Sequence, residues 1–167
     1  DKDPEDELLL ANKYVKMVIK PSIGGVIASF RYKGVDFTQP KVPSAPGGGG
    51  GFLADNINAQ GGGDWWEAPY QHKLLENTAD RISLQLWATG KTGPCAYLTV
   101  YKTITLHKDR SDVQVDWDYQ LSKGATAAIP FRFLYHSYVG TREGIMKSKN
   151  FSYFAPRGSV YGRTWSI

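Results

Sequence analysis

The sequence predicts an all-β protein, and three observations lead to this prediction. Glycine and tyrosine are frequent, with 18 and 10 copies in 167 residues. Short runs rich in Val, Ile and Thr end at turn residues, which is typical of strands joined by turns. Apolar and polar residues alternate at the two-residue period of a strand over much of the chain, and long Leu/Ala/Glu/Lys periods are missing.

The bulk composition is that of one ordinary globular domain. The chain is 41% hydrophobic and 22% charged, which suits a single domain with a sizeable core. We therefore expect a polar lead-in over residues 1–7 and a single β-sandwich domain over residues 8–167. This domain could continue in a missing or separate segment. The net charge of +4 is mild and the basic residues are scattered, so we expect no nucleic-acid partner.

Cysteine usage and targeting signals set further bounds. Cys95 is the single cysteine, which excludes an internal disulfide and a thiol metal site. No run approaches the ~20 apolar residues of a membrane span, and no signal peptide is present. The start at Asp1, without Met, suggests a mature, processed or trimmed chain. The triplet Asn150-Phe151-Ser152 fits a glycosylation acceptor. These two features favour an exported protein, periplasmic or extracellular.

The first forty residues predict a meander of short strands. The expected strands cover Leu8–Ala11, residues 14–20, Val26–Tyr32 and residues 35–37. In the second of them the apolar residues Val15, Met17 and Ile19 alternate with Lys16 and Lys20, as in a half-buried strand. Glycine turns at Gly24-Gly25 and Lys33-Gly34 separate the strands.

A long loop is expected over residues 38–63, because this stretch holds three prolines and two glycine clusters. Residues 52–56 are expected to form a brief ordered piece within it. Asp64, Trp65, Trp66 and Glu67 follow the loop and allow two interpretations. The Trp pair could be a sugar platform, because pyranose CH faces stack on indole while carboxylates bind the hydroxyls. Alternatively, one Trp lies in the core and the other covers it.

The middle of the chain is more regular. His72 and residues 73–77 are expected to form a short connection that ends before three strands. These strands are expected over residues 81–87, residues 97–106 and Val113–Leu121. Lys102 is the exception on the inward face of the second strand. The acidic face of the third strand fits an exposed sheet face better than a catalytic site.

The chemically richest stretch covers residues 127–140. One face at the strand period is apolar, with Ile129, Phe131, Phe133 and Tyr135. The other face carries Arg132, Leu134, His136 and Tyr138. A cation, an imidazole and a phenol at this spacing predict a polar site on a rigid element. Residues 141–167 alternate more weakly and end on Trp165 and Ile167, so we expect a second chain or a missing C-terminal segment to complete the sheet.

The order of these features resembles the aldose 1-epimerase or galactose-mutarotase-like superfamily over residues 8–140. The resemblance rests on the early Gly-Gly turn, the long glycine-rich loop, the strand-hairpin-strand over residues 93–119 and the stretch over residues 130–140. Tyr135-His136-Ser137-Tyr138-Val139 matches a family motif similar to Asn-His-Ser-Tyr-Phe-Asn-Leu, whose His is the general acid. The resemblance implies a large antiparallel β-sandwich with His136 as the acid. It supplies no counterpart of the family's glutamate base.

The chemistry implied by the resemblance is opening of a sugar ring. Mutarotation needs a base for the anomeric hydroxyl proton and an acid for the ring oxygen, and each transfer contributes about 10²–10⁴-fold. An imidazole with a pKa near 6.5 suits the acid role. We expect Arg132, Tyr138, Trp65 or Trp66 to contact the sugar, with Asp64, Glu67 and His72 as further candidates. The alternative for His136 is a histidine packed inside the sandwich.

The sequence therefore predicts a carbohydrate-binding β-sandwich protein that could act as an epimerase-like isomerase. Two alternatives stay open, a non-catalytic glycan-binding module and an assembly subunit that uses exposed strands such as residues 161–167. No phosphate-binding or metalloprotease motif and no Gly-x-Ser-x-Gly is present, so we expect no cofactor. Asp55, Asp64 and Glu67 could hold a calcium ion together with loop carbonyls.

Overall fold

The computed structural model describes residues 7–38, 51–57, 64–125, 133–136, 140–141 and 144–145. Several sequence predictions lie outside these residues: the lead-in over residues 1–6, Arg132, Tyr138, the glycosylation candidate Asn150 and the terminal stretch over residues 161–167. Apart from one 3₁₀ helix, η1 (Gly93–Tyr97), the regular structure in the described part of the chain is strand. No helix there is both long and apolar enough to cross a bilayer.

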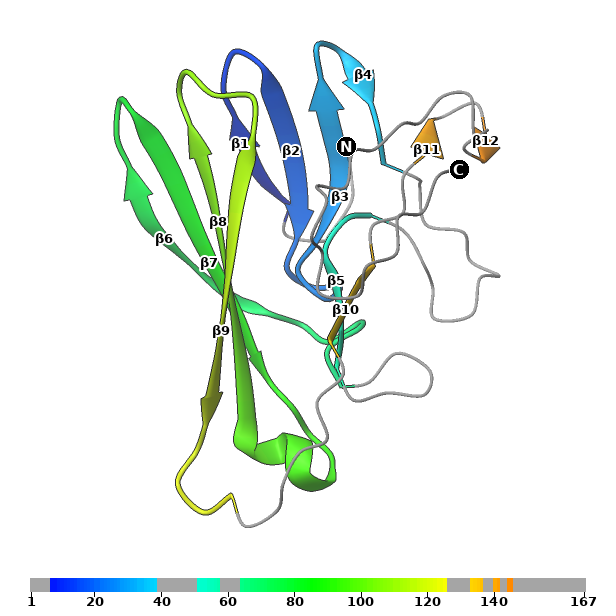
Figure 1. The fold of residues 1–167 in the computed structure, drawn as a ribbon, viewed down its shortest axis with the longest axis vertical. Helices are drawn as coiled ribbons and strands as arrows, with labels where there is room; N and C mark the ends of the chain where they lie inside the picture. Colours follow the sequence, from blue (N-terminus) through cyan, green and yellow to red (C-terminus); the bar gives the residue numbers. More distant parts are fainter. Residues whose placement is uncertain are drawn as a thin grey trace, which may run out of the picture.

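The first sheet is a four-stranded antiparallel meander (Figure 1). Its strands, in spatial as in chain order, are β1 (Leu8–Ala11), β2 (Val15–Lys20), β3 (Val26–Tyr32) and β4 (Val35–Asp36). Tyr32 pairs with Val35 across the two-residue turn Lys33-Gly34. Both turn residues have positive φ, at 49° and 83°, which is the backbone that matches the twist of a tight hairpin.

The second sheet is also a four-stranded antiparallel meander. It consists of β6 (Gln71–Asn77), β7 (Arg81–Thr89), β8 (Leu98–His107) and β9 (Val113–Leu121). The short connection expected over residues 73–77 is wrong, because these residues belong to β6. A register shift between Leu74 and Glu76 interrupts the alternation, and both Leu74 and Leu75 are exposed. A bulged edge strand therefore lacks the period-2 pattern by which strands are recognised.

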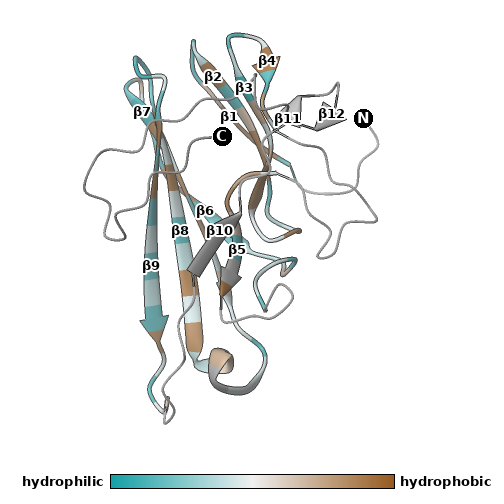
Figure 2. Cartoon of the chain, turned by 45° about the vertical axis from the view of Figure 1, so that its right-hand side comes forward, coloured by the Kyte–Doolittle hydropathy of each residue, from teal (hydrophilic) through white to brown (hydrophobic). Residues whose placement is uncertain are grey.

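The two sheets bury one hydrophobic core between them. Its buried members come from both sheets and include Leu10, Val15, Met17, Ile19, Ile27, Leu84, Leu86, Ala88, Leu98, Val100, Ile104 and Leu106. Figure 2 shows hydrophobic residues alternating with hydrophilic ones along the strands of both sheets, as expected for strands with one buried face. The prediction of an all-β sandwich is confirmed.

Two smaller ribbons accompany the sheets. β5 (Ala54–Ile57) pairs antiparallel with β10 (Phe133–His136), and β11 (Gly140–Thr141) pairs with β12 (Gly144–Ile145). β5 is thus an ordered strand inside the long loop that the sequence predicts, overlapping the ordered piece expected there. Ala54, Asp55 and Ile57 are buried, which ties this strand to the sandwich interior.

Candidate functional site

Both tryptophans of the expected sugar platform belong to the protein interior. Trp65 is fully buried, and its indole N–H donates a hydrogen bond of 3.0 Å to the carbonyl of Ala88. Trp66 is 8% exposed and packs in a small cluster with Val26 and Ala54. In this structure neither indole offers a face to solvent, so both fit the core interpretation.

Asp64 holds a loop in place. Its carboxylate accepts hydrogen bonds from the backbone N–H groups of Lys91 and Thr92, at 2.6 and 2.7 Å, and from the Thr92 hydroxyl at 2.8 Å. Burial alone would raise the pKa of the Asp64 carboxyl, but these hydrogen bonds outweigh it and lower the pKa below the usual 3.8. Asp64 therefore fastens the turn after β7 to the Trp65 segment.

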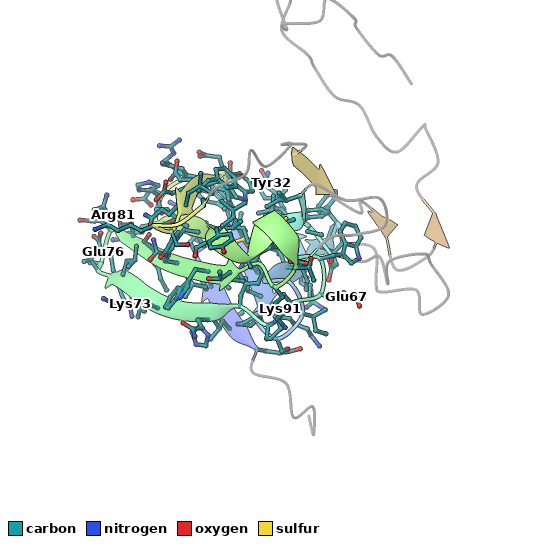
Figure 3. All side chains as sticks on the ribbon, turned by 90° about the horizontal axis from the view of Figure 1, so that it is seen from below. Tyr32, Glu67, Lys73, Glu76, Arg81 and Lys91 are labelled. Carbon is teal, nitrogen blue, oxygen red and sulfur yellow. The ribbon has the colours of Figure 1, made fainter. Side chains whose placement is uncertain are left out.

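The remaining candidates, Glu67 and His72, are exposed side chains. Glu67 is exposed and lies on the same side of the molecule as Lys91 (Figure 3). His72 is exposed on the edge strand β6, opposite Leu86 in register. Within the described ranges no three His, Cys, Asp or Glu side chains are grouped so that they could hold a metal ion. Asp55, Asp64 and Glu67 thus do not assemble into a calcium site.

The strand with the candidate general acid lies beside β5. Figure 1 shows β10 beside β5. In this ribbon His136 is opposite Ala54 and Tyr135 is opposite Asp55. The backbone of His136 is therefore one residue away, in register, from a buried carboxylate. This pairing connects the stretch that the sequence marks as chemically richest with the interior of the sandwich.

A buried network of polar side chains lies at β5, and we call it the Asp55–Lys102 network. Asp55 and Lys102 are both 0% exposed, and the Lys102 ammonium is 2.9 Å from the Asp55 Oδ2 atom. The same Oδ2 accepts a hydrogen bond of 2.8 Å from the Tyr70 hydroxyl. The Oδ1 atom accepts one of 3.0 Å from the indole N–H of Trp117. The four side chains come from β5, β8, β9 and the segment before β6.

The ammonium of Lys102 is fully satisfied. Besides Asp55 it donates to the carbonyl of Leu53 at 2.9 Å and to the carbonyl of Gly24 at 3.4 Å. Three acceptors for three N–H groups offset much of the cost of burying this charge. Leu53 has a φ of 62°, a left-handed conformation that is rare for leucine, and its carbonyl is one of the three acceptors.

Tyr70 acts in the network as a neutral donor. Burial raises the pKa of its hydroxyl well above the ordinary value of 10.0, and the negative charge of Asp55 raises it further. Its ring also lies 5.2 Å from the Lys102 ammonium, within the range of a cation–π contact. Tyr70 therefore touches both charges of the ion pair.

The sequence analysis identified Lys102 and Asp55 separately, without connecting them. Lys102 stands out as a charged residue on an otherwise apolar strand face, which is rare unless the charge is paired. Asp55 lies within the ordered piece of the long loop, and Trp117 shares the apolar face of β9. The sequence contains the signal for a buried charge but not the identity of its partner.

Comparison of the chain with protein-family models, with curated proteins and with solved structures finds no match.

Proposed function

We propose that the chain is a carbohydrate-binding β-sandwich protein of the galactose-mutarotase-like type, in which His136 acts as general acid in sugar-ring opening. The observation that carries this proposal is the antiparallel pairing of β10 with β5. It attaches the strand of His136 to a strand whose Asp55 is fixed by side chains of β8 and β9. A reacting group works best on a rigid element that is itself held by packing and hydrogen bonds.

In this proposal the roles are divided between His136 and the network. His136 protonates the ring oxygen, and a separate base removes the proton of the anomeric hydroxyl. Asp55 is unsuited to be that base, because it is fully buried and its oxygens already accept three hydrogen bonds. Asp55 and Lys102 instead serve as positioning residues for β5, and Arg132 and Tyr138 are proposed to contact the sugar.

A second candidate function is glycan binding without catalysis. The hydrogen bonding of Asp55 favours this alternative. The buried carboxylate beside β10 already accepts hydrogen bonds from Tyr70, Lys102 and Trp117, so it is unsuited to act as the base. Such a module would use β10, because Trp65 and Trp66 lie in the interior.

The proposal is tested by the rate at which the α and β anomers of D-glucose and D-galactose interconvert, followed by polarimetry or exchange NMR. The wild-type protein is expected to accelerate interconversion, and His136→Ala to lose about 10²-fold or more of that acceleration. His107→Ala is the matched control, because His107 lies at the β8–β9 hairpin, and it should keep the wild-type rate.

Each other outcome assigns the protein differently. A His136→Ala variant with the wild-type rate would contradict the general-acid role. Sugar binding by the wild-type protein in a titration, without any acceleration of interconversion, would support the non-catalytic module. A wild-type protein that neither binds nor converts these sugars would favour the assembly subunit.

A further inference from the structure

The outer face of the second sheet carries a pair of aromatic rings. Trp87 on β7 lies directly opposite Tyr101 on β8 in the antiparallel register. Their ring centroids are 6.3 Å apart and their planes differ by 22°, so the two rings are stacked. Both side chains are half-buried, and they alternate with the buried Leu86 and Val100. They therefore lie on the face of the sheet that points away from the core.

Polar side chains surround this pair in rows across the sheet. The row of the two rings reads Gln71, Trp87, Tyr101 and Asp118 across β6, β7, β8 and β9. The neighbouring row reads Lys73, Gln85, Thr103 and Asp116. Gln71, Lys73, Asp116 and Asp118 are exposed at the two sides of the sheet, and Lys73 extends from β6 towards solvent (Figure 3).

Several of these polar groups are held in place by hydrogen bonds within the face. Gln120 donates to the Asp118 carboxylate at 2.6 Å, and Gln85 donates to the Thr103 hydroxyl at 3.4 Å. The hydroxyls of Thr89 and Thr99 are 2.8 Å apart in the row on the other side of the rings. A ligand on the rings would meet acceptors and donors whose positions are already set, which lowers the entropic cost of binding.

We propose that this surface, which we call the outer platform, is a second glycan-binding site that takes a neutral polysaccharide chain. It is defined by Trp87 and Tyr101 with Gln71, Gln85, Thr103 and Asp118. Flat aromatic faces pack against the apolar faces of pyranose rings, while amides, hydroxyls and carboxylates bind the equatorial hydroxyls. The platform is separate from the β5–β10 ribbon, and it does not depend on catalysis by His136.

The chemistry of the face selects this ligand over other partners. The core of a protein interface is depleted in charged residues, whereas the neighbours of these rings include Lys and Asp beside Gln and Thr. Nucleic acids and acidic polysaccharides would meet the exposed carboxylates of Asp116 and Asp118 on β9 and be repelled. A neutral chain has hydroxyls for the polar rows and no charge to be repelled.

The test is affinity gel electrophoresis in hydroxyethyl cellulose, xylan and galactomannan, with polygalacturonate as the acidic comparison. The wild-type protein is expected to be retarded by at least one neutral polysaccharide and less by polygalacturonate. Trp87→Ala and Tyr101→Ala should each raise the Kd by at least about tenfold. Trp87→Phe keeps an aromatic face and should retain most of the affinity. Tyr97→Ala is the matched control, because Tyr97 is an aromatic residue 41% exposed outside the platform.

Circular dichroism of each variant shows whether it is folded. Because Trp87 and Tyr101 lie on the outer face of the sheet, their substitution should leave the core intact. Retardation in none of the three neutral polysaccharides would overturn the proposal. Equal retardation of wild type, Trp87→Ala and Tyr101→Ala would overturn it as well. His136→Ala is expected to be retarded like wild type. If His136→Ala alone abolishes retardation, the binding belongs to the β5–β10 ribbon and the outer platform is excluded.

Discussion

Two ion pairs link the second sheet to other parts of the chain at nearly the same distance but in opposite surroundings. Lys102 and Asp55 are 2.9 Å apart and 0% exposed. Lys13, in the turn between β1 and β2, and Asp109, in the hairpin between β8 and β9, are 2.8 Å apart with side chains 57% and 69% exposed. The two distances therefore do not distinguish how much each ion pair contributes to stability, whereas the difference in burial does.

The physical difference lies in what remains when one partner is removed. At the exposed pair, water hydrates either charge and salt screens their attraction. At the buried pair, a single remaining charge would have neither water nor a counter-ion, and neighbouring donors and acceptors would also lose their partners. The buried network, which holds β5 against the second sheet, should therefore contribute more to stability than the exposed contact.

The largest loss of stability is expected for Lys102→Met, which keeps the length of the side chain and removes the charge. It leaves Asp55 without its counter-ion and the carbonyls of Leu53 and Gly24 without this donor. We expect the free energy of unfolding to fall by about 3–5 kcal/mol, measured by urea denaturation. A Lys102→Met variant as stable as wild type would show that the buried pair contributes nothing to the fold.

A smaller effect is expected for Tyr70→Phe, which removes one hydrogen bond to Asp55 and keeps both charges. Because the acceptor is a buried carboxylate, the loss should be about 1.5–3 kcal/mol. The pKa of Tyr70 is raised in the folded protein, so its neutral hydroxyl stabilises the fold fully below pH 10. This contribution declines as the pH rises above the unfolded value of 10.0.

Urea denaturation between pH 8 and pH 11 checks both parts of this prediction. Wild type should lose stability more steeply than Tyr70→Phe above pH 10, so that the two curves converge. Tyr97→Phe is the control, because Tyr97 is an exposed tyrosine and its substitution should leave the slope unchanged. Parallel curves for wild type and Tyr70→Phe would contradict the assigned role of the hydroxyl.

The smallest effect is expected for Lys13→Ala. Asn12 keeps the two halves together at this end, since its amide donates to the carbonyls of His107 and Arg110 at 2.6 and 2.8 Å. The denaturation midpoint of Lys13→Ala should match that of wild type within error, and more closely as salt is added. A loss comparable to that of Lys102→Met would remove the distinction between the two ion pairs.

The strands with a clear period were predictable in detail. The expected bounds of Leu8–Ala11, Val26–Tyr32 and Val113–Leu121 agree with β1, β3 and β9. β6 was missed, because its bulge and its exposed leucines remove the alternation. The sequence did not decide whether Trp65 and Trp66 bind sugar or lie in the core, since a buried and a sugar-binding indole have the same sequence signature.

The all-β class, the turn positions and the inward faces can be predicted from local sequence, because they depend on neighbouring residues and on the pleat of a single strand. The contact between Lys102 and Asp55, 47 residues away, and the pairing of β10 with β5 emerge only in the folded chain. The polar outer face that Trp87 and Tyr101 share also emerges only there. The reason is that such contacts depend on strand register and sheet closure, which no local pattern encodes.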